Sequence, residues 1–515
     1  MTSGAASVAR AELFITVFAT GVAALLVEIM GTRIIGPVFG VNLFVWAALL
    51  AVTLGSLAAG YYAGGVWADK RPDTRLLGLV VVIAGVLLGL VPVFSRGVLG
   101  FSAALGPRTG SLLSATLLFA PCLLALGMIG PIAVRLATTE LRAAGHGVGA
   151  VYAVSTVGSL LGTLLTAFVL IPALETDQIL LGAAVSLLLL GGLLLARRQR
   201  PAALLALLVP AFASTTSRQV SLPHGIERLD RSQSIYGLVE VIDDHNRDVR
   251  FLRADHSIIG AQFLRDGSSA FAFLHLLEAI QFLRPQAKAL LQIGLGIGSL
   301  PRALERRGIA VDVVEIDPAI VRFARAYFGF STRGETFVED ARTFLVRTER
   351  KYDLIVHDTF TGGTNPEHLL SLEVVRRIRD LLRPGGVLAL NFVGHQSGPQ
   401  AEASWAVART IHAVFPNVRV FKDSRPDDRP DAPANLIFFA SEEALEFLIP
   451  DKVRFGNDAR ADVLRSFQNW EVLKQVPDGP LITDRHNPLA RLQLPVAEEH
   501  FEAMNELLPR EVWLY

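Results

Sequence analysis

The segment 290–317 constrains the fold most, because it joins a glycine-rich turn to an acidic residue one strand later. Its apolar start, Leu290–Ile293, suits a buried parallel strand. Three glycines then let the backbone turn sharply and approach a ligand closely: Gly294, Gly296 and Gly298. A second strand-like run ends at Glu315, roughly 20 residues after the first glycine, a spacing at which a carboxylate can bind ribose hydroxyls. The segment therefore predicts a nucleoside-cofactor site.

Helix signals follow both strands of this segment. Ser299 is expected to be the N-cap of the helix after the glycines, and Pro301 fits its first turn. Asp317, which precedes Pro318, is expected to cap the next helix. The pattern thus alternates strands with helices, as α/β folds do.

Acidic residues recur after further strand-like runs. Asp340 follows the run 335–338, and Asp358 follows the run 352–357. Open α/β sheets bind ligands at the carboxyl ends of their strands. This order resembles the methyltransferase-type Rossmann fold more than a dehydrogenase. The resemblance implies that the glycine turn holds the amino-acid or aminopropyl part of S-adenosylmethionine, Glu315 the ribose, and Asp340 with Ala341 the adenine. The competing interpretation is that Asp340 and Asp358 only cap the segments that follow.

Composition divides the chain into two halves. Its 515 residues are 51% hydrophobic with a mean hydropathy of +0.43, too apolar for one soluble enzyme, and the apolar residues concentrate before about residue 215. The net charge of +0 gives no sign of nucleic-acid binding. Cys122, the single cysteine, excludes an internal disulfide and a thiolate cluster. The 11 histidines show no metal-ligand spacing, so we expect no metal.

The apolar half contains six stretches long enough to cross a bilayer, which makes the lipid bilayer an expected partner. They are roughly 12–35, 42–65, 76–95, 110–136, 147–171 and 177–196. Pairs of glycines, such as Gly55 with Gly60 and Gly158 with Gly162, permit close helix contacts. The apolar segment 202–214 is short and contains Pro210, so we expect it to be interfacial or re-entrant, with a seventh span as the alternative.

Arginine and lysine concentrate in alternate loops, which predicts a cytoplasmic N-terminus. Six crossings would return the chain to the cytoplasm before the enzyme-like half, where S-adenosylmethionine is made. The first stretch is too long for a removed signal peptide. The expectation is a multi-pass protein of the inner or plasma membrane with a cytoplasmic catalytic domain.

Between the two halves, residues 226–262 contain alternating strands around a turn at 243–246. A β-hairpin region before a methyltransferase-like domain resembles the membrane-fused spermidine synthase (polyamine aminopropyltransferase) family. The apolar stretches VEIMGTRIIGPVFG and GAVYAVSTVGSLLGTLL are also similar to membrane segments attached to such domains. Four domains are expected: transmembrane helices (1–215), a β-hairpin region (216–265), a Rossmann domain (266–445) and a C-terminal extension (446–515).

The resemblance assigns roles to particular residues. IGLGIGS, VEIDP, EDAR and HDTFTGG stand where the family has its glycine loop, ribose glutamate, adenine aspartate and catalytic aspartate. Asp358 is thereby implied to be the base or amine-orienting carboxylate in aminopropyl transfer. Tyr236, Gln262 and His275 are the candidate acceptor-site residues, with a buried core position as the alternative for His275. Family relatives are commonly dimers, so a homodimer is possible.

The chain also departs from the family pattern. Ile297 replaces the aspartate expected to recognise the aminopropyl amine, and Thr361 replaces a second aspartate after the catalytic one. Phe273-Leu274-His275 stands where the family has Tyr-His-Glu. Sites for polycations should be lined by carboxylates. The sequence therefore points away from spermidine synthesis from putrescine.

Three classes of function stay open. The first is an aminopropyl-type transferase that uses S-adenosylmethionine or its decarboxylated form, with an amine or lipid-like acceptor. The second is a methyltransferase or lyase that consumes S-adenosylmethionine. The third is a transporter or membrane scaffold with a nucleoside-sensing domain, for which Glu28 is the clearest intramembrane acid, although it could simply pair with Arg33.

Overall fold

The computed structural model describes residues 2–70, 73–137, 144–196, 222–360, 362–423, 432–449, 462–464 and 466–513. The chain forms two compact units. The helical unit comprises Met1–Leu222 with Leu508–Tyr515, and the α/β unit comprises Pro223–Leu507. The predictions for segment 202–214 and for Thr361 lie outside the described residues.

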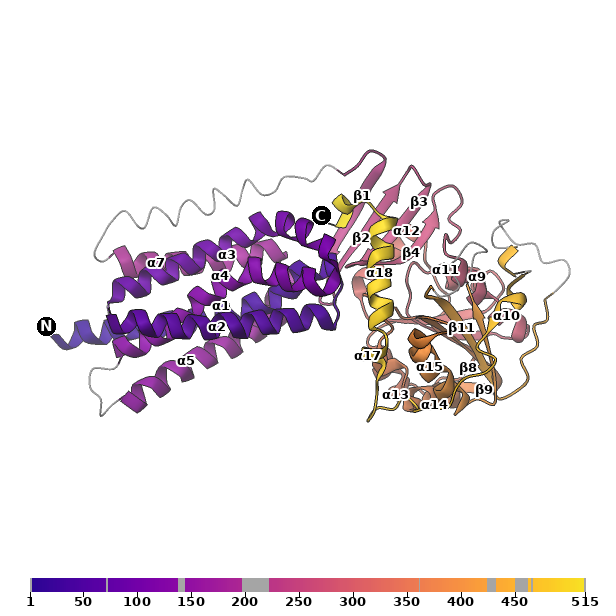
Figure 1. Cartoon of the computed structure of the whole chain (residues 1–515). Coiled ribbons are helices and arrows are strands. Elements are labelled where there is room, and N and C mark those ends of the chain that lie inside the picture. Colours follow the sequence, from indigo (N-terminus) through magenta and orange to yellow (C-terminus); the bar gives the residue numbers. More distant parts are fainter. Residues whose placement is uncertain are drawn as a thin grey trace. The chain divides into compact units, whose positions relative to one another are not determined.

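Long apolar helices run alongside one another in the helical unit (Figure 1). They are α1 (Thr2–Phe39), α2 (Leu43–Lys70), α3 (Thr74–Ser102), α4 (Gly106–Ala137), α5 (Ala144–Leu165) and α7 (Thr176–Ala196), with the short α6 (Ile171–Ala173) and α19 (Arg510–Trp513). By length and composition, five stretches of the described chain could cross a membrane. One of them, Thr74–Ala137, contains both α3 and α4, which the sequence analysis counted as two spans. Gly106, whose φ is 76°, lies where those two helices meet.

Glycines allow close helix packing at three of the four positions singled out in the sequence. A Cβ atom on Gly158 would lie 2.3 Å from the Phe18 carbonyl oxygen, and one on Gly162 would lie 2.7 Å from Val22 Cα, so α5 contacts the backbone of α1. A Cβ atom on Gly60 would likewise lie 2.3 Å from the carbonyl oxygen of Leu124 in α4. Gly55 has open space instead.

The α/β unit begins with an antiparallel sheet of four strands in chain order. The strands are β1 (Ile226–Gln233), β2 (Leu238–Asp244), β3 (Val249–Ala254) and β4 (Ser257–Phe263). The hairpin predicted around residues 243–246 is the β2–β3 connection. Gly260 of β4 packs on Ile297 of the glycine turn, because a Cβ atom there would lie 2.5 Å from the Ile297 side chain. The small sheet is thus seated against the nucleoside-site segment.

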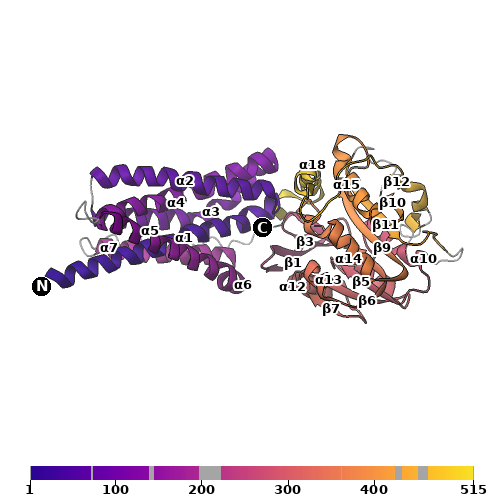
Figure 2. The same cartoon turned by 90° about the horizontal axis from the view of Figure 1, so that it is seen from below.

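The second sheet has eight strands in the order β12-β10-β11-β9-β8-β5-β6-β7, and part of this order is visible in Figure 2. Its strands are β5 (Ala289–Ile293), β6 (Ala310–Glu315), β7 (Thr336–Val338), β8 (Tyr352–His357), β9 (Leu382–Gly394), β10 (Asn417–Lys422), β11 (Ala434–Ser441) and β12 (Glu471–Val472). The five strands from β7 to β9 are parallel. The chain runs outward from β5 through β6 to β7 and then returns to place β8 on the other side of β5. Such a reversal between β5 and β8 is where open α/β sheets bind ligands.

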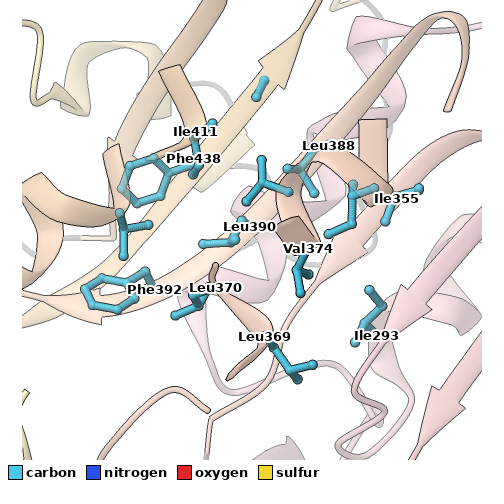
Figure 3. Packing of buried hydrophobic residues seen from close by; sticks show 14 of the residues in the cluster. Ile293, Ile355, Leu369, Leu370, Val374, Leu388, Leu390, Phe392, Ile411 and Phe438 are labelled. Carbon is cyan, nitrogen blue, oxygen red and sulfur yellow. The ribbon is translucent and has the colours of Figure 1, made fainter. Parts of the chain in front are cut away.

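Helices cover both faces of this sheet and bury its apolar strands. One face packs against α13 (Ala341–Arg347), α14 (Leu372–Leu381) and α15 (Glu402–His412). Figure 3 shows this core, to which Ile293, Ile355 and Leu388 of the strands and Val374 of α14 all belong. The other face packs against α9 (Ala272–Glu278), α10 (Ile280–Leu283), α11 (Ser299–Glu305) and α12 (Pro318–Phe328). Burial of each large side chain contributes about 1.5–3 kcal/mol, which keeps the strand ends in fixed positions.

The α/β unit also includes most of the expected C-terminal extension. Helices α17 (Leu489–Leu492) and α18 (Leu494–Leu507) belong to it. The segment before them is attached to α14, since the Leu372 N–H donates to the Ile482 carbonyl oxygen at 2.8 Å. Arg342 of α13 donates to Asp484 at 2.9 Å. The extension therefore packs on the same fold that carries the predicted nucleoside site.

Candidate active site

The glycine turn is built from three residues in left-handed conformations. The φ angles of Gly294, Gly296 and Gly298 are 86°, 54° and 73°, values that side-chain-bearing residues rarely adopt. A Cβ atom on Gly294 would lie 2.1 Å from the carbonyl oxygen of Asp358, so the ends of β5 and β8 are in direct contact. Gly298 is the N-cap of α11, and the prediction that Ser299 caps this helix is wrong by one residue.

Glu315 ends β6 and supports the turn from beneath. Its Oε2 accepts a hydrogen bond from Leu295 N at 3.0 Å, and its Oε1 accepts one from Asp317 N at 3.0 Å. Only 7% of Glu315 is exposed. Burial raises the pKa of the Glu315 carboxyl, although the backbone N–H groups of Asp317, Leu295 and Ile316 oppose this effect. A carboxylate has about four acceptor positions, so this one keeps room for a further hydrogen bond.

Asp317 caps α12, as the sequence predicted. Its Oδ1 accepts a hydrogen bond from Ala319 N at 2.8 Å, and its Oδ2 accepts one from the Ser234 hydroxyl at 2.6 Å. Ser234 lies in the connection between β1 and β2. This hydrogen bond therefore fastens the small sheet to the carboxyl edge of the large one.

Tyr236 belongs to the same connection and stands close to three carboxylates. Burial raises the pKa of its phenol, and the negative charges of Asp317, Asp340 and Glu315 raise it further. The side chain is nevertheless 45% exposed. The structure thus brings this candidate acceptor-site residue to the predicted nucleoside site.

Asp340 is the N-cap of α13, whose first residue is the buried Ala341. Its Oδ1 accepts hydrogen bonds from Thr343 N at 2.9 Å and Thr343 Oγ1 at 3.1 Å. Its Oδ2 lies 3.6 Å from His368 Nε2. Burial alone would raise the pKa of Asp340, but the Thr343 hydrogen bonds and the nearby His368 bring it below its ordinary value. The cap uses one oxygen, so a second role for Asp340 is compatible with it.

Asp358 follows β8 at the reversal point of the sheet. Its backbone N–H donates to the Ile293 carbonyl oxygen at 2.9 Å, which places it beside the glycine turn. Its Oδ1 accepts a hydrogen bond from Asn391 Nδ2 at 2.9 Å. Burial raises the pKa of the Asp358 carboxyl to about 6, even though the Asn391 hydrogen bond lowers it. A group that titrates near neutral pH can accept a proton under physiological conditions.

The other two candidate acceptor residues are engaged elsewhere. Gln262 of β4 is buried, and its Oε1 lies 3.3 Å from Arg302 Nη2 of α11. His275 is buried in α9 among core residues, and its Nδ1 lies 3.3 Å from Glu278 Oε1. These surroundings favour the core interpretation for His275. Gln262 lies beside the helix that follows the glycine turn.

Ile297, which departs from the family pattern, is a core residue. It is 2% exposed and packs in an apolar cluster with Val239 and Val241 of the small sheet and Phe323 and Phe328 of α12. A carboxylate in this cluster would be separated from water without a partner. The position where the resemblance implied an amine-binding aspartate is therefore used here to pack the small sheet against the glycine turn and α12.

Asn391 is the residue of this site that the sequence analysis missed. It is 2% exposed, lies within an apolar stretch of β9, and orients the Asp358 carboxylate. Within the described part of the chain, its Oδ1 has no hydrogen-bond partner. One polar residue in the otherwise apolar run 387–393 is the signal that could have drawn attention to it.

Comparisons with known proteins agree with this architecture. Residues 276–442 match the model of the spermine/spermidine synthase domain. Polyamine aminopropyltransferase 2 of Streptomyces coelicolor is 30% identical over 399 residues, which cover 71% of this chain and 69% of that protein. The N-terminal histidine N-methyltransferase of Emericella nidulans is 29% identical over 364 residues, 61% of this chain and 65% of that protein. A polyamine aminopropyltransferase of Vibrio vulnificus is 33% identical over 161 residues, 30% of this chain and 53% of that protein.

The chain thus spans less than two thirds of the length of the latter two relatives. Among solved structures, the spermidine synthase of Thermotoga maritima aligns with 49% of this chain and 94% of its own, with 19% identity and a TM-score of 0.38. The sequence relatives named here are aminopropyltransferases and a methyltransferase, so all of them are transferases. More specifically, the chain belongs to the spermidine synthase (polyamine aminopropyltransferase) family.

Proposed function

We propose that this protein transfers an alkyl group from the sulfonium of an S-adenosylmethionine-type nucleoside to an amine acceptor. The observation that carries this proposal is Asp358, a carboxyl group with a pKa of about 6 at the reversal point of the sheet, against the glycine turn. Family membership makes aminopropyl transfer from decarboxylated S-adenosylmethionine the first candidate reaction.

The residues at the carboxyl edge fit such a nucleoside. The left-handed glycines leave no side chain above the turn, where the amino-acid or aminopropyl part would lie. Glu315 keeps acceptor capacity for a ribose hydroxyl. Asp340 Oδ2, which the helix cap does not use, would accept a hydrogen bond from the adenine amino group, next to Ala341.

Asp358 would hold and deprotonate the amine. The attacking nitrogen must be neutral and aligned with the carbon–sulfur bond that breaks. Asp358 accepts the proton that this nitrogen loses, while Asn391 orients the carboxylate. The nucleoside, when bound, supplies the sulfonium leaving group, whose sulfur keeps the bonding electron pair as a thioether.

A second candidate is methyl transfer from intact S-adenosylmethionine to an amine. The buried Ile297 favours it, because the aspartate expected to recognise the aminopropyl amine is missing. The Emericella nidulans relative is named as a methyltransferase that acts on an N-terminal histidine. The same arrangement of Asp358 and the glycine turn would serve both reactions, since each is an in-line attack on carbon bound to sulfur.

The long apolar helices support a multi-pass membrane location. The distribution of arginine and lysine favours a cytoplasmic α/β unit. An acceptor that is lipid-like or delivered from the bilayer would fit this arrangement, as would a homodimer of the family type.

The test is calorimetric binding of three nucleosides to the full-length protein in detergent micelles, followed by mass spectrometry of the products. The nucleosides are S-adenosylmethionine, its decarboxylated form and methylthioadenosine. Methylthioadenosine released only with an amine supports aminopropyl transfer, and S-adenosylhomocysteine supports methyl transfer. Methylthioadenosine released without an amine indicates a lyase. If none of the three nucleosides binds, the proposal is wrong, and nucleoside binding without any turnover indicates a transporter or membrane scaffold with a nucleoside-sensing domain.

A further inference from the structure

Helices α17 and α18, with Gln493 between them, form a C-terminal arm (residues 489–507) that packs on the loop after Asp358. A Cβ atom on Gly363 would lie 3.0 Å from Ala497 Cα. The rings of Phe360 and His500 meet edge to face, with 5.1 Å between their centroids. The arm therefore contacts the segment that immediately follows the reacting carboxylate.

Gln493 binds this loop through both the oxygen and the nitrogen of its side-chain amide. Its Oε1 accepts a hydrogen bond from Asn365 N at 2.8 Å, and its Nε2 donates to the Asn365 carbonyl oxygen at 3.2 Å. Gln493 is 1% exposed and Asn365 is 2% exposed. Two hydrogen bonds in a buried position fix both the place and the orientation of the Asn365 backbone.

The Asn365 side chain then connects the loop to strand β9. Its Nδ2 donates to the Thr359 carbonyl oxygen at 2.7 Å and to the Asn391 carbonyl oxygen at 3.3 Å. Its Oδ1 accepts a hydrogen bond from Val393 N at 3.2 Å. Thr359 is next to Asp358 in the chain, so Asn365 joins the neighbour of the carboxylate to the strand that carries Asn391.

We propose that Gln493 and Asn365 are positioning residues, which hold Asp358 and Asn391 in register so that the hydrogen bond between them forms. The C-terminal arm is then part of the active site. The proposal rests on the proposed function insofar as Asp358 is the reacting carboxylate, but the geometry it describes does not depend on which nucleoside binds.

The arm has other attachments that would hold it in place without Gln493. Val496, Ala497 and Phe501 are buried apolar residues of α18. The Ser257 hydroxyl lies 3.1 Å from His500 Nε2. Replacing Gln493 by methionine, which has a similar shape but no amide, should therefore remove the grip on Asn365 and leave the arm docked.

The test labels Asp358 of the full-length protein with a water-soluble carbodiimide and an amine at a series of pH values. Peptide mass spectrometry measures the extent of labelling at each pH. Carbodiimides activate protonated carboxyl groups, so the midpoint of labelling reports the protonation of Asp358 without any nucleoside. Asn391→Leu removes the hydrogen bond that favours the charged form and should raise the midpoint by roughly half a unit to one unit. Gln493→Met and Asn365→Ala should raise it in the same direction.

Val496→Ala is the matched control, because it loosens the packing of the arm and keeps the amide grip. It should unfold at a lower temperature and leave the labelling midpoint unchanged. The proposal is overturned if Gln493→Met has the wild-type midpoint while Asn391→Leu raises it, or if Val496→Ala raises it as much as Gln493→Met. Failure of the proposed function is a separate result. In that case the protein binds no nucleoside, although the labelling midpoints of the variants still shift as expected.

Discussion

Replacing Asp358 by asparagine should stabilise the protein at neutral pH while abolishing turnover. Burial raises the pKa of folded Asp358 from 3.8 to about 6, and a difference of about two units corresponds to about 3 kcal/mol. This is an upper value, because Asp358 as a residue is only partly buried. The stability contributed by the protonated form is fully present below pH 3.8 and is lost as the pH rises through about 6. The Asp358→Asn variant has no charge to bury, so it escapes this loss.

The assay is thermal unfolding of both ligand-free proteins in detergent micelles between pH 4 and pH 8. The two should unfold at similar temperatures at pH 4, and the variant should unfold roughly 6–10 °C higher at pH 8. Turnover of the variant should fall by about 10²-fold or more. Asp353→Asn is the control, because Asp353 lies on β8, the strand that Asp358 follows. Burial alone would raise the pKa of Asp353, but the N–H groups of Lys288 and Ala289 hold it below its ordinary value, so this change should destabilise at pH 8. If Asp358→Asn also destabilises at pH 8, the carboxylate is not a costly buried group and the reasoning fails.

Three further variants test the nucleoside site. Glu315→Gln should weaken nucleoside binding about 10–100-fold in calorimetry, since a hydrogen bond to a charged group contributes about 1.5–3 kcal/mol; unchanged affinity would remove Glu315 from the ribose site. Ile297→Asp should cost about 3–5 kcal/mol in unfolding experiments without improving binding of decarboxylated S-adenosylmethionine, because the new charge is buried among apolar side chains. Gly294→Ala should abolish nucleoside binding, because its Cβ atom would clash with the Asp358 carbonyl oxygen. Gly308→Ala, at an equally left-handed position with open space, should cost only about 1 kcal/mol and bind normally; equal effects of the two changes would refute the steric argument.

The parts of the site that the sequence predicted are those that depend on local pattern. Glycines at strand-to-helix turns, the cap formed by Asp317 and carboxylates after apolar runs are all visible within short windows of the sequence. The pairing of Asp358 with Asn391 joins residues 33 positions apart, and that of Asn365 with Gln493 joins residues 128 apart. No local periodicity encodes such pairs, because they arise only when the sheet order and the docking of the arm are known.

His275 shows a second limit of sequence reasoning, a residue that the sequence suggested for the site and the structure places in the core. Its place after the hairpin suggested an acceptor-site residue, whereas the structure buries it in α9 against Glu278. A histidine in a short apolar helix looks the same in sequence whether it faces a ligand or the core. Only the packing of α9 under the sheet distinguishes the two cases.

The carboxylates at the sheet edge fall into two groups, according to whether backbone or side-chain groups donate hydrogen bonds to them. This difference limits which residues of the site could change during evolution. Glu315 supports the glycine turn, Asp317 caps α12 and Asp340 caps α13, so backbone N–H groups hold all three. Asp358 differs, because a side chain, Asn391, holds its carboxylate. Loss of one of the first three carboxylates would disturb the backbone at the sheet edge. The negative charge that favours a cationic sulfonium nucleoside is therefore also needed for a stable fold. The Asp358 carboxylate depends instead on a side chain of β9 that the C-terminal arm positions, and acceptor specificity is therefore expected to vary there.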